Sequence, residues 1–140
     1  MSVETQVQPR IALRLRLDTG PCSIPLHRVH HLAGYATLAG EPEDYFLGWL
    51  TFHGDSVPVF DLNRVVCDQP TPEVFGSRIL ILAAAPESPT RLLGLLAAGV
   101  TDTLSPADPH HSDFPPLDLD SYLPMLYTMI PAQPPIPVSA

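Results

Sequence analysis

The sequence contains no lysine, and all seven of its basic residues are arginines. Fifteen acidic residues leave a formal net charge of −8, and no arginine follows Arg91. An acidic chain without a basic run lacks the electrostatic footprint of a nucleic-acid-binding protein or of a protein held on anionic lipid. We therefore expect no nucleic acid as a partner and no direct insertion into a membrane.

Cysteines and long hydrophobic runs are also scarce. Cys22 and Cys67 are the only cysteines, which is too few for a disulfide framework. They leave open one disulfide or two inert buried thiols, and the sequence favours the thiols because no basic residue adjoins either cysteine. The longest apolar runs, Ile79–Ala85 and Leu92–Val100, are too short to cross a bilayer. With no apolar stretch of a signal peptide near Met1, we expect a cytoplasmic protein.

Short motifs of catalytic and metal sites are missing as well. The chain has no Cys-x-x-Cys pair, no phosphate loop ending in Gly-Lys-Ser and no Gly-x-Ser-x-Gly elbow. Its histidines cluster only at His27, His30 and His31 and at His110-His111, and neither spacing is that of a zinc signature. We expect no catalytic residue, no metal and no cofactor, and hence no enzyme. A small sensor domain that binds a ligand or metal through these histidines is the alternative from another class.

What the sequence does contain is hydrophobic alternation. Hydrophobic residues make up 45% of the 140 residues, enough for the core of one domain. The alternating pattern of Ile11–Leu17 predicts a strand with one wet face. Arg78–Ala85 and Leu92–Val100 predict two buried strands that pair, with Pro86–Thr90 as the loop between them. Four of their side chains should lie in the core: Ile79, Ile81, Leu93 and Leu95.

Helical patterns are nearly absent, so the sequence predicts an all-β chain with little helix. Asp118–Met129 can hold one short helix, which Pro124 would limit, and Asn63–Cys67 a brief turn. We expect a single domain over residues 9–130, a polar N-terminal tail over residues 1–8 and a proline-rich C-terminal tail over residues 131–140.

The stretch Gly48–Leu62 is the centre of the sequence and predicts a β-hairpin. Its turn falls at His53–Ser56, because Gly54 can take a positive φ. Pro58 cannot donate to a ladder and should lie at an edge or at a strand start. Simple alternation divides the first strand into two faces, Leu47, Trp49 and Thr51 on one and Phe46, Leu50 and Phe52 on the other.

The same stretch carries a resemblance to a known family. Gly48, five further residues, and then Gly54-x-x-Val57-Pro58-Val59-x-Asp61-Leu62 are similar to the signature of the CheW-like domain. Segments on both sides of the hairpin also resemble that family and follow its order: Leu15–Leu17, Ile24–Leu26, Arg78–Leu82 and Gly94–Leu96.

The resemblance implies two small five-stranded barrels packed together, without catalytic activity. It also implies an adaptor of a bacterial chemosensory system that couples chemoreceptors to a CheA-type histidine kinase. The partners would be the regulatory domain of that kinase and the cytoplasmic tip of a chemoreceptor. The alternative within the family is a divergent CheW-like domain that serves another pathway, such as surface motility.

The hypothesis for partner binding names six residues: His31, His53, Gly54, Trp49, Val57 and Asp61. Trp49 has a competing interpretation as a core residue, which the sequence favours. His31 and His53 stand where the family usually has a glutamate and an arginine that lie close enough to pair. We therefore expect the two histidines to be neighbours, with weaker receptor binding than in the family. The competing interpretation is that both are partly exposed and unconnected.

Overall fold

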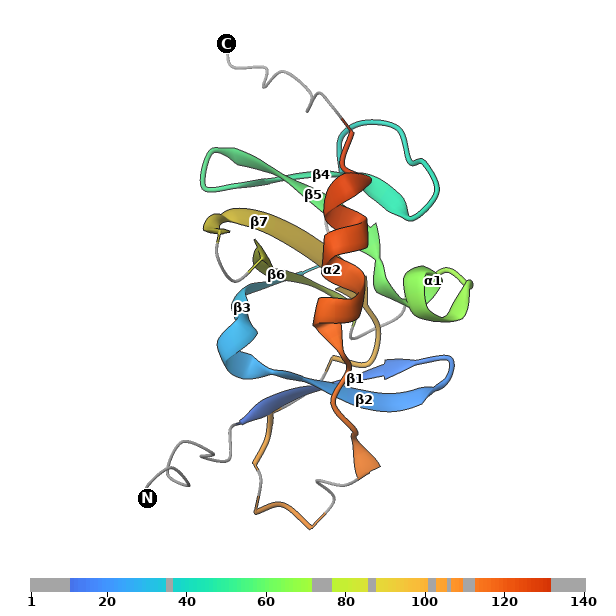
Figure 1. The fold of residues 1–140 in the computed structure, drawn as a ribbon, viewed down its shortest axis with the longest axis vertical. Coiled ribbons are helices and arrows are strands. Elements are labelled where there is room, and N and C mark those ends of the chain that lie inside the picture. Colours follow the sequence, from blue (N-terminus) through green and yellow to red (C-terminus); the bar gives the residue numbers. More distant parts are fainter. Residues whose placement is uncertain are drawn as a thin grey trace.

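The computed structural model describes residues 11–34, 37–71, 77–85, 88–100, 103–105, 107–109 and 113–131. Two β-sheets and two short helices make up this part of the chain (Figure 1). The expected mainly β fold with little helix is therefore confirmed. The expected tails, residues 1–8 and most of 131–140, lie outside the described residues.

The smaller sheet has three strands in the order β2-β1-β8. Strand β1 (Ala12–Leu17) turns through Asp18-Thr19 into β2 (Gly20–Pro25), and β8 (Thr103–Leu104) pairs with the other side of β1. Alternation holds over Leu13–Leu17, but the prediction is wrong at the start of the stretch, where Ile11 is 49% exposed and Ala12 is buried. Leu13, Leu15 and Leu17 are buried, whereas Arg16 is exposed.

The larger sheet has five strands in the order β3-β6-β7-β5-β4. After a 3-10 turn at Leu26–Arg28 comes β3 (Val29–Gly34), and the hairpin consists of β4 (Phe46–Phe52) and β5 (Asp55–Asp61). The second predicted hairpin is β6 (Arg78–Ala85) with β7 (Ser88–Ala97), which starts earlier than the apolar run indicated. Its four expected core residues, Ile79, Ile81, Leu93 and Leu95, are all buried.

Within the described residues neither sheet closes into a barrel. The three strands of the small sheet are too few to close, and the large sheet has β3 and β4 as its two edges. The two packed β units implied by the resemblance are present, but as one three-stranded and one five-stranded open sheet. Because each strand is rotated against its neighbour, the large sheet nevertheless curls until residues of its two edges meet.

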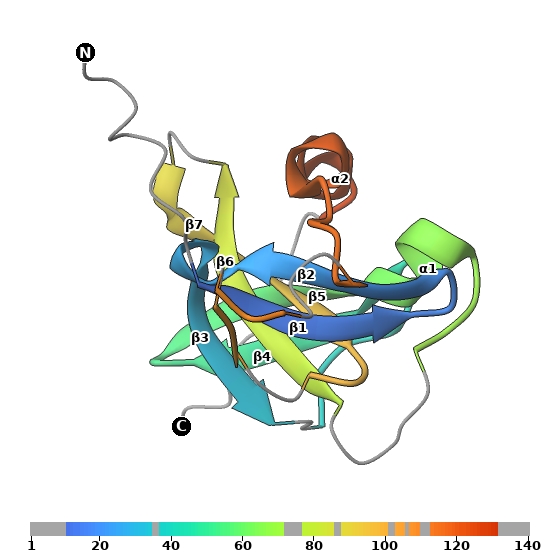
Figure 2. The same ribbon diagram turned by 90° about the horizontal axis from the view of Figure 1, so that it is seen from below.

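Helix α2 (Leu119–Thr128) runs across both sheets and covers one side of them (Figures 1 and 2). Leu119, Leu123 and Leu126 recur at helical spacing, are buried, and join the core that the two sheets share. Pro124 lies inside the helix but on its exposed side, so the predicted short helix is confirmed with the proline tolerated.

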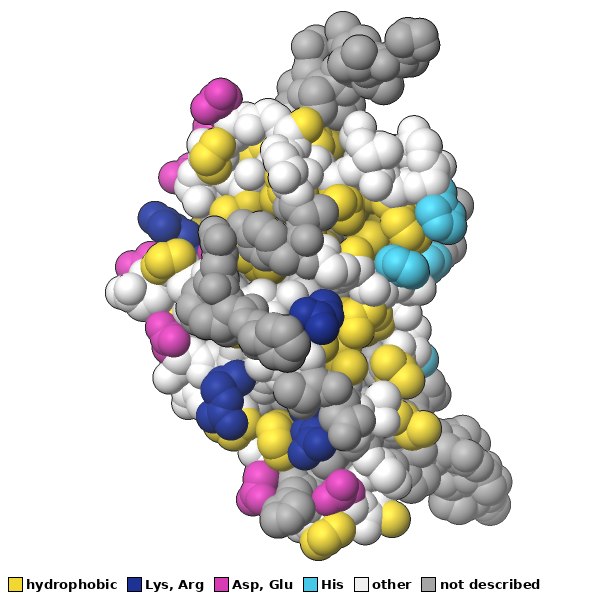
Figure 3. Space-filling model, turned by 180° about the vertical axis from the view of Figure 1, so that it is seen from behind, with side chains coloured by type: hydrophobic (Ala, Val, Ile, Leu, Met, Phe, Trp, Pro, Cys, Tyr) yellow, Lys and Arg dark blue, Asp and Glu magenta, His cyan; other side chains and the backbone are white. Residues whose placement is uncertain are grey.

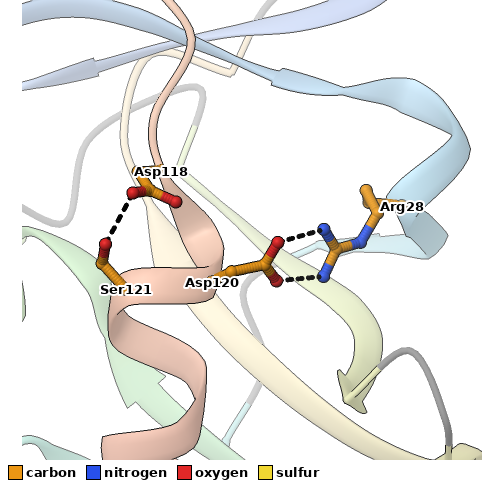
Figure 4. Close-up of polar contacts among 4 residues, drawn as sticks. All are labelled: Arg28, Asp118, Asp120 and Ser121. Carbon is orange, nitrogen blue, oxygen red and sulfur yellow. Dashed lines mark hydrogen bonds and ion pairs between the residues drawn. The ribbon is translucent and has the colours of Figure 1, made fainter.

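Polar contacts fix the start of α2. Arg28, at the end of the 3-10 turn, forms a two-pronged ion pair with Asp120, with Nη2 3.1 Å from Oδ1 (Figure 4). Ser121 donates a hydrogen bond of 2.6 Å from Oγ to Asp118, the residue before the helix. The segment that leads into the helix pairs with β2, since Ser23 N–H donates to the Pro115 carbonyl and Leu117 N–H donates to the Ser23 carbonyl. The helix is thereby tied to the small sheet while its leucines pack on the large one.

The hairpin corrects one prediction about its faces. The pairing of β4 with β5 shifts register between Phe46 and Gly48, which is a β-bulge. A bulge adds one residue to a strand, so side chains after it point to the opposite face from the one that simple alternation predicts. Phe46 therefore lies in the main core cluster with Trp49, and their ring centroids are 5.5 Å apart. Leu47 packs with Leu50 in a second, smaller core cluster of the large sheet. The predicted grouping of Leu47 with Trp49 and of Phe46 with Leu50 was wrong for this reason.

Pro58 also departs from its prediction. Strand β5 is an inner strand, between β7 and β4, and not an edge. Its pairing with β7 begins only at Val59, one residue after the proline. The proline is tolerated because it precedes that ladder.

Candidate functional site

The turn of the β4–β5 hairpin consists of two residues with positive φ, His53 at 51° and Gly54 at 85°. Two positive φ values between paired strands are the mark of a type I′ turn, whose twist matches that of the strands. The turn thus places His53 at the tip of the hairpin, with its side chain exposed. The predicted positive φ at Gly54 is confirmed, and the loop is shorter than the predicted four residues.

His31 approaches this tip from the opposite edge of the sheet. It lies on β3, and its ring centroid is 5.0 Å from that of Phe52 and 6.5 Å from that of His53. Phe52 and His53 stack with centroids 4.1 Å apart and an interplanar angle of 18°. We call His31, Phe52 and His53 the ring cluster. The expected proximity of the two histidines is therefore observed, and that they act as a pair stays a prediction.

The ring cluster joins β3 to β4 where no ladder joins them. Aromatic contacts of this kind contribute on the order of 0.5–1.5 kcal/mol beyond buried area when they are well packed. The exposed setting of the two histidines places the contribution of this cluster toward the lower end. Phe52 was not among the predicted site residues. Its position directly before His53, at the turn of the hairpin, could have indicated it.

Three of the six predicted partner-binding residues are at the surface: His31, His53 and Gly54. The other three are inside. Trp49 is 7% exposed and packs edge-on against Phe46, Val57 is 2% exposed, and Asp61 is 3% exposed. Side chains this deeply buried offer a partner almost no area, so the core interpretation of Trp49 holds and all three residues support the hairpin from within.

Asp61 has a structural role that the sequence pattern concealed. As the residue before helix α1 (Leu62–Cys67), it accepts a hydrogen bond of 3.2 Å from the Arg64 N–H. Its carboxylate also accepts a hydrogen bond of 2.9 Å from the Thr71 N–H and another from the Thr71 hydroxyl. Capping of this kind satisfies donors that a helix start leaves unpaired. The predicted brief turn at Asn63–Cys67 is in fact this six-residue helix.

The two cysteines are free thiols in the structure. Cys22 is buried in the main core, and Cys67 is partly buried against the same cluster. Burial raises the pKa of the Cys22 thiol to about 11, and the nearby Cys67 adds to this effect. A thiol with a raised pKa is a poor nucleophile and a poor metal ligand at neutral pH, which agrees with the predicted inert, buried thiol at Cys22. Cys67 is only partly buried, so the same prediction is not met there.

The described parts of the chain contain no group of three or more histidine, cysteine, aspartate or glutamate side chains that could hold a metal ion. Neither described helix is both long and apolar enough to cross a membrane.

Comparisons with known proteins bear on the fold. No protein-family model matches the sequence, and no curated protein matches it. The structure is similar to the crystal structure of the scaffolding protein TtCheW from Thermoanaerobacter tengcongensis, with a TM-score of 0.57. The two chains are 18% identical, and the similarity covers 75% of this chain and 67% of that one. The CheW-like fold implied by the sequence is thereby confirmed.

Proposed function

We propose that the protein is a non-enzymatic adaptor of a bacterial chemosensory system, which couples chemoreceptors to a CheA-type histidine kinase. The observation that carries this proposal is the fold shared with a scaffolding protein, TtCheW. The signature of Gly48 and Gly54 to Leu62 supports it from the sequence side. The mechanism is binding: two rigid β units present fixed surfaces that hold kinase and receptor relative to one another.

His31, His53 and Gly54 are the residues we propose for partner contact. All three are exposed: His53 and Gly54 form the tight two-residue turn of the hairpin, and His31 lies beside them on β3. Residues on a rigid scaffold lose little conformational entropy when a partner binds. Trp49, Val57 and Asp61 hold this tip in place from the core.

The experiment is a calorimetric titration of the full chain against the purified regulatory domain of the cognate kinase, and separately against a cytoplasmic receptor fragment. Small transient signalling interfaces bury on the order of 1,200 Å² or less, so we expect micromolar affinity for each. His31→Ala should weaken one of the two interactions, while Met125→Ala, on the exposed side of α2, should change neither. Absence of binding to both proteins would contradict the proposal.

A divergent CheW-like domain of another pathway, such as surface motility, is the second candidate. The observation that favours it is the presence of His31 and His53 where the resembled family has a glutamate and an arginine. Binding to the kinase domain without binding to any chemoreceptor fragment would support this candidate over the first.

A further inference from the structure

Three arginines lie where the small sheet meets the large one. Arg14 and Arg16 alternate with the buried leucines of β1, so both belong to the outer face of the small sheet. Arg78 is the first residue of β6 in the large sheet. We call these three residues the arginine patch.

The end of β7 brings these residues together. Ala97 pairs with Arg78 in the ladder between β6 and β7. The next residue, Ala98, bridges to Arg16 and accepts a hydrogen bond of 3.0 Å from its N–H. Gly99 then passes β1 so closely that an added Cβ would lie 2.9 Å from the Cβ of Arg16. Two strand spacings of about 4.8 Å and one residue step of about 3.8 Å place the Cα atoms of Arg16 and Arg78 roughly 10–13 Å apart.

The arginine patch is open to solvent. Arg16 is exposed and Arg78 is half-buried. Figure 3 shows arginine side chains that gather near the middle of the back face, while acidic side chains lie toward its flank and its lower end. Asp18, two residues after Arg16, is the nearest acidic residue along the chain, and it forms no ion pair with a described residue.

Two of the three charges have no opposite charge bound to them within the described parts of the chain. Neither Arg16 nor Arg78 forms an ion pair there, and Arg78 donates a hydrogen bond of 2.9 Å to the carbonyl of Ser77. A guanidinium has five N–H donors, so both side chains keep donors for a ligand. Arg14 is engaged, because its guanidinium lies 5.2 Å from the ring centroid of Phe114. The binding capacity of the patch therefore rests on Arg16 and Arg78.

We infer that the arginine patch binds a short acidic segment of a partner protein, with Arg16 and Arg78 each binding one carboxylate. The planar fork of a guanidinium matches a carboxylate with two parallel hydrogen bonds. A separation of roughly 10–13 Å corresponds to three or four residues of an extended segment, at about 3.3 Å for each residue. Two acidic residues at that spacing can therefore reach both arginines at once.

Other occupants match the patch less well. A long polyanion such as nucleic acid would be repelled by the rest of the surface, because the chain carries a net charge of −8. The same charge disfavours a second copy of this chain. The inference goes beyond the proposed adaptor function, because the arginine patch shares no residue with the ring cluster. Its test uses neither kinase nor receptor, so it succeeds or fails independently of that function.

The probe is a capped peptide, Glu-Thr-Val-Thr-Glu, which carries its two glutamates at the ends. It is added to the isotope-labelled full chain at about 0.1 M salt, where a Debye length of about 10 Å screens the distant acidic residues. We expect saturable shifts of the amide signals of residues 14–17, 77–79 and 97–99, and no shift with the capped peptide Gln-Thr-Val-Thr-Gln. Absence of saturable shifts, shifts confined to other residues, equal shifts with the glutamine peptide, equal shifts with inorganic phosphate at the same ionic strength, or peptide-induced dimerisation would each overturn the inference.

Charge variants sharpen the test. Arg16→Gln and Arg78→Gln should each raise the Kd of the glutamate peptide about two- to fivefold, and Asp18→Asn should lower it, because it removes the carboxylate at the end of the patch. Arg91→Gln is the control with the same change of charge. Arg91 is exposed and lies toward the other end of β7, roughly 20 Å from Ala97 at about 3.3 Å for each residue. An equal rise of the Kd in Arg91→Gln would indicate only the overall charge and would overturn the inference, as would an unchanged Kd in both patch variants.

Discussion

The carboxylate of Asp61 accepts a hydrogen bond of 2.9 Å from the backbone N–H of Thr71, ten residues further along the chain. The same side chain caps α1 through the Arg64 N–H at 3.2 Å. One buried carboxylate therefore fixes both the start of the helix and the return of the loop that follows it. These bonds give a structural reason for the aspartate in the Val-Pro-Val-x-Asp-Leu pattern, without any contact to a partner.

Asp61→Asn should lower the free energy of unfolding by about 1–3 kcal/mol. The amide keeps one acceptor oxygen but loses the charge that strengthens the bonds to Thr71 and Arg64, and its NH₂ group faces donors. Urea denaturation monitored by circular dichroism measures this. The control is Asp55→Asn, an exposed carboxylate on the same strand, which should change stability by less than about 0.5 kcal/mol. Equal effects at the two positions would refute the capping role.

Gly48 supports a close approach of backbone that no other residue allows. It has φ of +144°, and an added Cβ would lie 2.7 Å from the Cβ of Leu38 and 2.8 Å from the carbonyl oxygen of Ala39. We predict that Gly48→Ala destabilises the protein by more than about 1 kcal/mol, because the bulge and its pairing with Ala39 must both shift.

Gly34 is the matched control for this substitution. It lies on β3 and has nothing within 4 Å of the position of an added Cβ. Gly34→Ala should be neutral or stabilising by up to about 1 kcal/mol, since alanine restricts the unfolded chain. A Gly48→Ala protein as stable as the Gly34→Ala protein would show that the contact with Ala39 is dispensable.

Hydrophobic alternation and turn residues sufficed to predict most strands, because both are local properties of the sequence. Ile79, Ile81, Leu93 and Leu95 form a buried hairpin for this reason. The bulge at Phe46–Gly48 was not predictable from alternation, since it is a shift in the register between β4 and β5. The same holds for Pro58, whose tolerance depends on where the ladder between β5 and β7 begins.

The candidate site was predicted in part, again for physical reasons. Family resemblance placed His31 and His53 together although they are 22 positions apart, because a common fold conserves distances between strands. It could not separate the exposed residues of the hairpin from those buried beneath it. Val57 and Asp61 belong to the signature for packing and capping, and sequence patterns do not distinguish such a role from binding.

The two thiols should differ in reactivity. At pH 8, a disulfide reagent such as dithionitrobenzoate should modify Cys67 quickly and Cys22 only after unfolding, because Cys22 is buried and its pKa is raised to about 11. Mass spectrometry of the modified peptides identifies the site. Rapid modification of Cys22 in the folded protein would contradict this.

The raised pKa of Cys22 also predicts a dependence of stability on pH. The folded state holds the thiol proton more tightly than the unfolded state, whose pKa is near 9.0. The contribution of this group is therefore complete below pH 9 and is lost as the pH rises from 9 toward 11. Between these values stability should fall less steeply in Cys22→Ala than in the natural protein. Parallel pH profiles of the two proteins would show that Cys22 does not carry the effect.

The ring centroids of His31 and His53 are 6.5 Å apart, a gap that a glutamate and an arginine can span with their longer side chains. We predict that His31→Glu combined with His53→Arg forms an ion pair across the seam between β3 and β4. At an exposed position such a pair should contribute about 0.2–1 kcal/mol of coupling energy, measured by a double-mutant cycle in urea. The same double variant should bind a chemoreceptor fragment more tightly than the natural protein, because a permanent guanidinium replaces an imidazole.

The turn conformation dictates the control for this experiment. His53 has φ of 51°, which arginine adopts at a cost and asparagine adopts readily. His53→Asn removes the imidazole without adding charge and preserves the type I′ turn, so it separates the effect of charge from that of backbone strain. If the double variant binds the receptor fragment no better than the natural protein, and the two single substitutions are additive in stability, then these positions do not act as a pair and the proposed role of His31 and His53 in partner contact is wrong.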